Sequence, residues 1–399
     1  MVFIAILSAL ALLILLQNVL YRKRGLRNLT YDSEFEVREA FCGDYVYMFE
    51  TLSNAKKLPL PYVKVNTDLE HGLVFVIIEE KGSERHAAET DSIQSIFVMK
   101  ADSSVKRRWR IRCKKRGVYA PPSSLLIASD LFGLEIMTHT SLRPTGDVTD
   151  PDKCLTVLPS VIDLRCEFVS PTNLSGDVIS NHCPISDPLM VAGSREYTPL
   201  DPMNRINWKS TAVHSQLMVN VEEKTVRHTF GVMLNMSSRM LEKNPAVPGD
   251  TEAIEKCITV CASIFDRAAE LDVPVRLYAN TTPSPLLRDT VEPEGDGAKI
   301  LVTPFYTGRT HALELMRILA HIRMEISLPT ESMLDHVASH PELYAECVNL
   351  VIVSAYLDSR IVGLYRQMKK YGTKVICYLT TGRCDVADIP EGMEIYYRT

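Results

Sequence analysis

Residues 193–223 read GSREYTPLDPMNRINWKSTAVHSQLMVNVEE, and this stretch divides the chain into two regions of different character. It is dense in charged and aromatic side chains, and it contains Trp208, one of only two tryptophans in the sequence. Short strand patterns dominate before it, whereas apolar strands alternate with long helical patterns after it. This change of period predicts a β-rich region followed by an α/β region.

The length and composition are those of a globular protein with two domains. The chain has 399 residues, of which 46% are hydrophobic and 23% are charged, and domains usually hold about 100–200 residues. The formal net charge of -5 argues against a general nucleic-acid-binding protein, because such proteins normally present a basic surface. We therefore expect no nucleic-acid partner.

The ten cysteines include no Cys-x-x-Cys pair, and they are spread along predicted strands and helices. This distribution is typical of reduced thiols in a reducing compartment rather than of a disulfide framework. Cys257 and Cys261 lie four residues apart on a predicted helix, so they share a face. Because no further metal ligands lie nearby in the sequence, we interpret both as core residues.

Residues 1–21 form an apolar segment with Ser8 as the only polar residue in its first part, and the basic run 22–24 follows directly. About 20 apolar residues cross a bilayer as a helix. A cleaved signal peptide would need a basic start and a small-residue cleavage site, and both are missing. We therefore expect a single-pass anchor in the lipid bilayer of the cell membrane. The positive-inside rule then places the bulk of the chain, 22–399, in the cytoplasm.

Residues 22–170 contain short strand patterns separated by turn signals, which predict a β-sandwich domain. The clearest strand patterns lie at 45–49, 62–65, 74–78, 96–99 and 108–112. The run 45–49 is continuously apolar and rich in aromatic residues, which favours a more buried strand.

A string of basic residues overlaps the last of these strand patterns. It consists of Lys106, Arg107, Arg108, Arg110, Arg112, Lys114, Lys115 and Arg116. One interpretation is a solvated strand face. The other is a contact with the anionic inner leaflet to which the domain is tethered. We favour the solvated face.

Residues 226–399 predict an α/β domain with a mostly parallel sheet, because apolar strands alternate there with helical patterns. The run 230–236 is nearly continuously apolar, as expected for a strand buried on both faces. Strands are predicted at 230–236, 274–279, 300–303, 348–354, 374–379 and 393–397, and helices at 251–271, 310–324 and 359–371.

The end of the first α/β strand is where many such sheets carry Asp-x-Ser-x-Ser, which binds a divalent cation through carboxylate and hydroxyl oxygens. Here Asn235 replaces the carboxylate, Ser237 is retained, and Arg239 brings a positive charge in place of a hydroxyl. Mg²⁺ prefers hard oxygen ligands in near-octahedral geometry. Asp358 is the one acidic residue that would rescue such a site. We therefore expect a degenerate site that binds no metal, and no cofactor.

Motif searches indicate no reaction. The sequence contains neither a Gly-x-Gly-x-x-Gly fingerprint nor a phosphate-binding Gly-Lys-Ser/Thr loop. It also lacks a Gly-x-Ser-x-Gly nucleophile elbow and a His-Glu-x-x-His zinc motif. We therefore expect a protein without enzymatic activity.

The order of residues in and around 193–223 resembles the bacterial family called domain of unknown function 58. Its signature is approximately Arg-Glu-Tyr-x-Pro-Gly-Asp-x-x-Arg-x-Ile-x-Trp-Lys-x-Ser-Ala-Arg, followed by a Leu and an acidic pair. With one extra residue after Asp201, the residues that match are Arg195, Glu196, Tyr197, Pro199, Asp201, Arg205, Ile206, Trp208, Lys209, Ala212, Leu217, Glu222 and Glu223. The upstream matches, in the same order, are Arg116-Gly117-x-Tyr119, Asp130-x-Phe132-Gly133-Leu134 and Val157-x-Pro159. Leu200 and Val213 depart from the family's Gly and Arg.

This resemblance implies a membrane anchor at 1–21, an Ig-like β-sandwich at 22–170, a signature segment at 171–225 and a von Willebrand A-like α/β domain at 226–399. Members of the family are commonly encoded beside MoxR-type AAA+ ATPases and are thought to work with them in assembling or activating other proteins. The resemblance therefore implies a non-enzymatic adaptor with such an ATPase as its protein partner. Its interaction residues would be Arg195, Glu196, Tyr197, Asp201, Arg205, Trp208 and Lys209.

Two alternatives stay open: a divalent-metal-dependent protein-binding domain of the adhesion type, and a hydrolase that uses the 193–223 stretch. We interpret that stretch as a junction leading into the first α/β strand. Within it, we expect Arg195 and Arg205 to pair with Asp201 or Glu196, while Trp208 packs beneath them.

Overall fold

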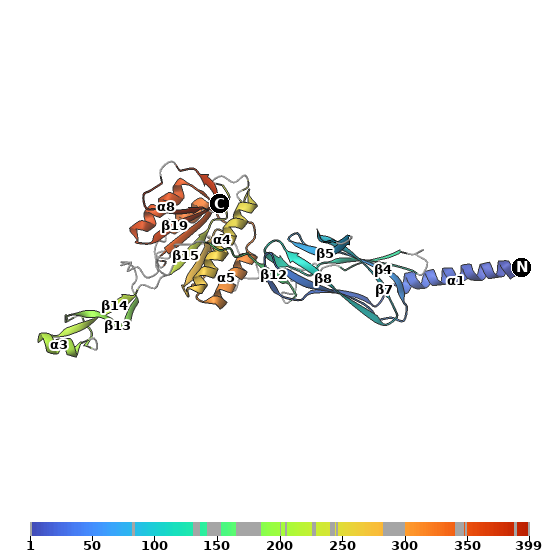
Figure 1. Ribbon diagram of the computed structural model, residues 1–399, viewed down its shortest axis with the longest axis horizontal. Coiled ribbons are helices and arrows are strands. Elements are labelled where there is room, and N and C mark those ends of the chain that lie inside the picture. The colour runs from blue at the N-terminus through green and yellow to red at the C-terminus, as the bar shows by residue number, and fades with distance from the viewer. Residues whose placement is uncertain are drawn as a thin grey trace. The chain divides into compact units, whose positions relative to one another are not determined.

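In the computed structural model of this chain, an apolar helix precedes a β-rich region and an α/β region (Figure 1). The structure divides into two compact units, Met1–Ser160 and Val161–Thr399. The residues that it describes are 2–81, 84–130, 136–141, 153–164, 185–199, 201–203, 206–225, 229–239, 244, 246–281, 300–339, 347, 349–386 and 389–397.

Helix α1 runs from Val2 to Arg24. Its 19-residue segment Ile6–Arg24 is long and apolar enough to cross a membrane, and only 7% of the apolar window is buried. The end of the helix is fixed on the β-rich region. The Tyr21 side chain is buried, and its hydroxyl donates to the Pro59 carbonyl at 2.9 Å. One turn earlier, the Gln17 amide donates to the Asp130 carboxylate at 3.0 Å.

Two antiparallel sheets build most of the β-rich region. The first has the order β1(Leu29–Phe35), β3(Tyr45–Asn54), β8(Ser103–Cys113), β5(Leu73–Lys81) and β6(Glu84–Thr90), and the second has the order β11(Ile136–Ser141), β10(Ser124–Ser129), β4(Leu60–Asp68) and β7(Ser92–Met99). A smaller sheet joins β2(Glu39–Phe41), β12(Leu155–Leu158) and β9(Gly117–Tyr119). Apolar side chains of the two larger sheets meet, since Leu52 of the first packs in one cluster with Phe97 and Leu126 of the second.

Strand β3 contains the strand predicted at 45–49, and it is buried on one face only. Val46 and Met48 are buried, whereas Tyr45 on the opposite face is 48% exposed. The reason is that β8 places basic side chains over the rings of this outer face, so cations cover the aromatic residues where a second layer of the protein would otherwise be needed.

The α/β region contains the mostly parallel sheet that the sequence predicts. Its strand order is β17(Leu301–Val302), β16(Val275–Ala279), β15(Phe230–Leu234), β18(Asn349–Leu357), β19(Lys374–Cys384) and β20(Glu394–Tyr397). Every neighbouring pair is parallel except β16 with β17. The helices here are α4(Thr251–Glu270), α5(Arg309–His321), α6(Thr330–Ser339) and α8(Ser359–Lys370), of which the sequence patterns missed α6.

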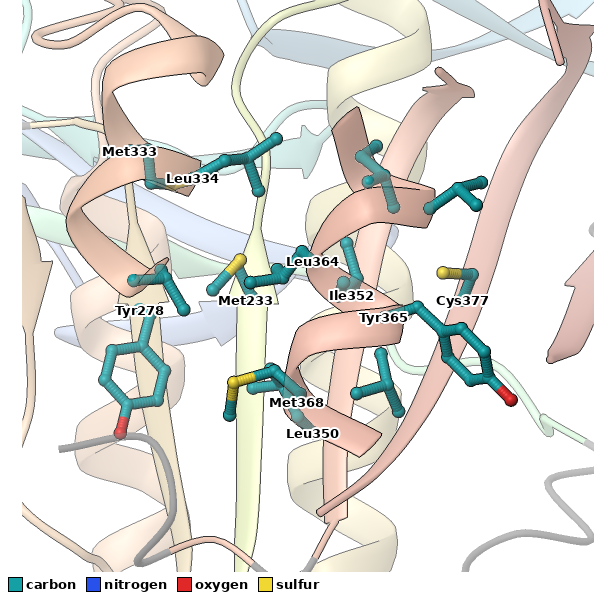
Figure 2. Close-up of a cluster of buried hydrophobic side chains, with 14 of the residues drawn as sticks. Met233, Tyr278, Met333, Leu334, Leu350, Ile352, Leu364, Tyr365, Met368 and Cys377 are labelled. Atoms are coloured by element: carbon teal, nitrogen blue, oxygen red, sulfur yellow. The ribbon is translucent and has the colours of Figure 1, made fainter. Parts of the chain in front are cut away.

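Helices cover both faces of this sheet. Met233, Ile352 and Cys377 are register partners on adjacent strands, so they share one face. Figure 2 shows this face with side chains from α6 and α8 packed on it, including Met333, Leu334, Leu364, Tyr365 and Met368. Helix α4 lies on the opposite face, where the Thr380 hydroxyl lies 3.2 Å from Cys257 Sγ. This arrangement explains why all five residues of β15 are buried.

The cysteines agree with the expectation of reduced, buried thiols. None of the eight that the structure describes is in a disulfide, and six of them are buried. Cys257 and Cys261 are completely buried on α4, which confirms them as core residues. The other two of the eight are Cys42, which is partly buried, and Cys384, which is exposed near the end of β19.

Candidate functional site

The stretch predicted as a junction forms a hairpin of its own. Strands β13(Ile185–Glu196) and β14(Met218–Thr225) pair antiparallel, and the seven-residue helix α3(Trp208–His214) lies between them in the sequence. Asn207 caps α3, since its side-chain oxygen accepts from the Ser210 N–H at 2.9 Å. The Asn207 amide also donates to the Asn220 side chain on β14 at 2.6 Å. Helix and strand are thus tied together by one asparagine.

An ion pair closes the turn after β13, as the sequence predicts. The two terminal nitrogens of Arg195 donate to the two carboxylate oxygens of Asp201 at 2.7 and 2.5 Å. The Thr198 N–H and hydroxyl donate to the same carboxylate at 2.9 and 2.7 Å. Donation from Arg195 and Thr198 holds the pKa of Asp201 well below its usual range. Such a weak base is poorly suited to general-base catalysis near neutral pH.

Glu196, Tyr197 and Lys209 are further signature residues that the structure describes. Glu196 contributes its backbone carbonyl, which accepts from Arg195 at 3.1 Å. The Tyr197 N–H donates to the Leu217 carbonyl at 2.8 Å. Lys209 is exposed on α3. Arg205 lies outside the described residues, so its expected pairing stays a prediction.

The expectation that Trp208 packs beneath the ion pair is wrong. Its side chain is 69% exposed, and α3 contains no buried residue. The small interior of the hairpin is occupied instead by Ile206, Met218 and Val219. Large apolar side chains are consequently left on and beside α3, and we call this set the α3 apolar group: Met203 (70% exposed), Trp208 (69%), Val213 (74%) and Leu217 (45%).

A second polar cluster lies at the carboxyl ends of β15 and β18, where the sequence indicates a degenerate metal site. The Asn235 amide nitrogen donates to Ser354 Oγ at 3.1 Å, and the Asn235 amide oxygen accepts from the Ser237 N–H at 3.0 Å. The Thr330 hydroxyl lies 2.9 Å from the same amide oxygen and 2.8 Å from Ser237 Oγ. The Tyr356 hydroxyl donates to Thr330 Oγ1 at 3.4 Å.

This cluster, which we call the Asn235 network, is neutral and closed. Both atoms of the Asn235 amide are used, and Asn235, Thr330 and Ser354 are buried. It offers no carboxylate to a dication, and the neutral oxygens are already engaged with one another. The donor set therefore does not fit Mg²⁺, which binds through carboxylates and water.

The nearby charged residues do not supply the missing ligand. Asp358 caps helix α8 by accepting from the Ile361 N–H at 2.9 Å, so it has a structural role rather than the one expected of a rescuing ligand. Arg239 is exposed and carries a positive charge at the same loop. Within the part of the chain that the structure describes, no group of three or more His, Cys, Asp and Glu side chains could hold a metal ion.

An ion pair fixes the loop that follows β15 from the other side. Asp250 caps α4 by accepting from the Ala253 N–H at 3.1 Å, and Arg383 donates to its second oxygen at 3.1 Å. These two donations lower the pKa of Asp250. Arg383 also donates to the Ser238 carbonyl at 3.3 Å. The loop is therefore held by internal bonds on both sides.

Sequence reasoning missed Thr330, although it joins Asn235 to Ser237. The available signal was the run Pro329-Thr330-Glu331, since a threonine followed by an acidic first turn is typical of a helix start. Ser354 and Tyr356 lie at and just after the end of the strand predicted at 348–354, and no sequence motif assigns them a role. Their donor capacity becomes visible once β15 and β18 are placed side by side.

No family model matches this chain, and no curated protein matches it. Many solved structures show a local likeness to it, and three of them serve as examples. The sporulation control protein Spo0M from Bacillus subtilis is 12% identical with a TM-score of 0.17, and the match covers 28% of this chain and 48% of that chain. AvmM, which catalyzes macrocyclization in alchivemycin A biosynthesis, is 9% identical with a TM-score of 0.18, and the match covers 30% of this chain and 93% of that chain. A non-cellulosomal cohesin from the hyperthermophilic archaeon Archaeoglobus fulgidus is 12% identical with a TM-score of 0.18, and the match covers 29% of this chain and 94% of that chain. The matched part spans about half the length of Spo0M. At these TM-scores the likenesses carry no inference about fold or function.

Proposed function

We propose that this chain is a membrane-anchored, non-enzymatic adaptor of the bacterial domain-of-unknown-function-58 type. In this proposal α1 is a single-pass anchor in the cell membrane, and the bulk of the chain is cytoplasmic. The β-rich region is an Ig-like sandwich, and the α/β region is a degenerate von Willebrand A-like domain. Its partner is a MoxR-type AAA+ ATPase, with which it assembles or activates other proteins.

The observation that carries an adaptor function is the α3 apolar group. Isolated exposed apolar residues are ordinary on a protein surface, but here four large ones occur within the 15 residues 203–217, on and beside one short helix. Tryptophan and methionine are enriched in protein interfaces, and tryptophan is a frequent hot-spot residue. The Asn207 cap and the Arg195–Asp201 ion pair fix the backbone around this group, which reduces the entropy lost when a partner binds.

The two alternatives receive less support from the same residues. A metal-dependent adhesion domain needs an anionic ligand at the Asn235 network, and the residues there are neutral and bonded to one another. A hydrolase built on 193–223 needs an activated base or nucleophile, and its best-placed carboxylate, Asp201, is held by Arg195 and Thr198. Both groups therefore favour a structural interpretation over a chemical one.

Site-specific photo-crosslinking tests the proposal. A photoreactive phenylalanine derivative replaces Trp208 in the full chain, which is co-expressed with the MoxR-type ATPase of the same genome. We expect a crosslinked product with that ATPase. The matched control carries the same derivative at Val98, which is 70% exposed on β7 and apolar like the α3 apolar group.

Affinity measurements complete the test. The double variant Trp208→Ala/Val213→Ala is expected to weaken ATPase binding by about tenfold or more, because a tryptophan hot spot alone is worth about 2 kcal/mol or more. Binding that is unchanged in this variant would show that the α3 apolar group is not the interface. Equal crosslinking from 98 and 208 would lead to the same conclusion.

A further inference from the structure

The outer face of strand β8 presents four basic side chains over aromatic rings. Lys106, Arg108, Arg110 and Arg112 alternate along the strand and project from the same face. Lys106 lies 4.2 Å from the centre of the Phe49 ring, Arg108 lies 4.3 Å from that of Tyr47, and Arg110 lies 4.0 Å from that of Tyr45. We call these four cations and their three rings the β8 cation ladder.

The rings hold the cations in a regular array. Each of the first three cations lies over the ring two positions before its own register partner on β3, so the offset repeats. A cation over an aromatic ring is attracted by the negative face of the ring. An arginine that stacks on a ring is restricted in its rotamers while the edge of its guanidinium stays available for hydrogen bonds. The ladder is therefore preorganised for anions.

The two ends of the ladder already show how it binds carboxylates. Lys106 contacts Glu34 at 2.8 Å, and Arg112 contacts Glu89 at 2.9 Å. The two middle residues, Arg108 and Arg110, are exposed and have no carboxylate partner among the residues that the structure describes. The guanidinium groups of Arg108 and Arg110 are thus available to an external anion, whereas Lys106 and Arg112 on either side already contact carboxylates.

The spacing of these two arginines defines the anion that fits. Residues two apart on a strand repeat at about 6.6–6.8 Å. An extended peptide projects every second side chain to one side with the same repeat. Carboxylates at alternate positions of such a peptide therefore match Arg108 and Arg110 together, and each guanidinium can bind its carboxylate through two parallel hydrogen bonds.

Two other anionic surfaces fit less well. The bases of a single-stranded nucleic acid bind by stacking on open aromatic rings, and here the cations cover the rings. A bilayer around α1 would approach the end of the region where Tyr21 packs with Leu52. Leu52 pairs with Val105, so Arg110 lies about 17 Å further along β8 at about 3.3 Å per residue. A flat membrane surface would therefore not reach the middle of the ladder.

We propose that the middle of the β8 cation ladder binds an extended acidic segment of a partner protein, with carboxylates at alternate residues seated on Arg108 and Arg110. This surface belongs to the β-rich region and does not depend on the α3 apolar group. It accordingly gives the protein a second docking site, which recognises charge pattern where the first recognises apolar surface.

Fluorescence anisotropy on the full chain in mild detergent tests this site. The probe is a labelled peptide of alternating Glu and Thr, and the comparison peptide has the same composition with its Glu residues in one block. We expect the alternating peptide to bind about tenfold more tightly than the block peptide. The Arg108→Gln/Arg110→Gln variant should lose about tenfold or more of that binding.

Two control variants separate pattern recognition from net charge. Arg366→Gln/Lys370→Gln removes the same charge from exposed positions of α8 and should leave binding unchanged. Arg108→Lys/Arg110→Lys keeps the charge but loses the bidentate geometry, so intermediate binding is expected. The proposal is overturned if the two Gln variants behave alike, if both peptides bind equally, or if oligothymidylate of equal charge binds more tightly than the alternating peptide.

Discussion

The Asn235 network makes a quantitative prediction about stability. The change Asn235→Ala removes an amide whose two atoms make three buried hydrogen bonds. The Thr330 hydroxyl keeps a bond to Ser237 Oγ, and Ser354 Oγ still accepts from the Tyr356 N–H at 3.3 Å, so the Ser237 N–H is the group left without its partner. A buried polar group left unsatisfied costs about 1–3 kcal/mol, and the hydrogen bond that Ser354 loses is worth about 0.5–1.5 kcal/mol, so the two together cost about 1.5–4.5 kcal/mol. With a urea m-value of about 3 kcal/mol/M, the unfolding midpoint should fall by about 0.5–1.5 M.

Pulsed thiol labelling of the full chain along a urea series measures this change for each unit separately. Buried Cys257, Cys261 and Cys377 report on the α/β region, and buried Cys113 reports on the β-rich region as an internal reference. Peptide mapping by mass spectrometry then gives one midpoint for each thiol. Only the α/β midpoint should move.

The matched control is Asn349→Ala, an amide removed from the opposite end of β18, where its side chain makes no hydrogen bond to the residues that the structure describes. We expect it to change stability by about 0.5 kcal/mol or less. An α/β midpoint that does not fall in Asn235→Ala would refute the closed network. A wild-type midpoint that rises with added Mg²⁺ would refute it as well, because binding to the native state would then stabilise it.

Three further predictions concern the hairpin and the thiols. Because the pKa of Asp201 is lowered in the folded state, its ion pair with Arg195 should be fully formed above the ordinary Asp pKa of about 3.9 and be lost only as the pH falls through the lower, folded-state value. Hydrogen exchange should accordingly show the Thr198 amide hydrogen equally protected from exchange at neutral and mildly acidic pH. In Asp201→Asn, this protection should be lost at both pH values. Burial raises the pKa of Cys113 and of Cys377 to about 12 each, so iodoacetamide at a pH of about 8.5 should label exposed Cys384 and leave both unlabelled; labelling of all three at one rate would contradict their burial. Trp208→Ala should leave the free energy of unfolding within about 0.5 kcal/mol of wild type, and a larger loss in thermal unfolding would mean that the indole is packed.

The α/β region could be predicted because its sequence patterns have one physical cause each. The apolar run of β15 reflects burial on both faces, and Ile254, Ile258 and Cys261 of α4 recur at helical spacing because they face the sheet. Helix α6 was missed because its apolar pattern is short. Because this helix was not predicted, its first residue, Thr330, could not be placed beside Asn235 either.

The hairpin and the β8 cation ladder were harder to predict for a different reason. A dense group of aromatic and charged residues usually indicates a packed tryptophan, but the α3 helix is too short to enclose Trp208. On β3, the aromatic residues Tyr45, Tyr47 and Phe49 lie on the outer face and the apolar residues Val46 and Met48 on the inner face, so the alternation of burial is hidden in a continuously apolar run. The alternation of burial becomes clear only in the structure, where β8 pairs with β3 and the cations of β8 cover the outer face of β3 in place of a further layer of the protein.

The seating of α1 on the β-rich region has a consequence for how the protein meets others. Tyr21 and Gln17 attach the last turns of the helix directly to the β-rich region, without a flexible linker between helix and sheet. In a bilayer, the β-rich region would therefore inherit the tilt of the helix instead of tumbling on a tether. Two such chains in one membrane would meet with their orientations already restricted, so less rotational entropy would be lost on contact. If α1 spans a membrane as proposed, it would restrict the orientation of the β-rich region in addition to holding it at the membrane.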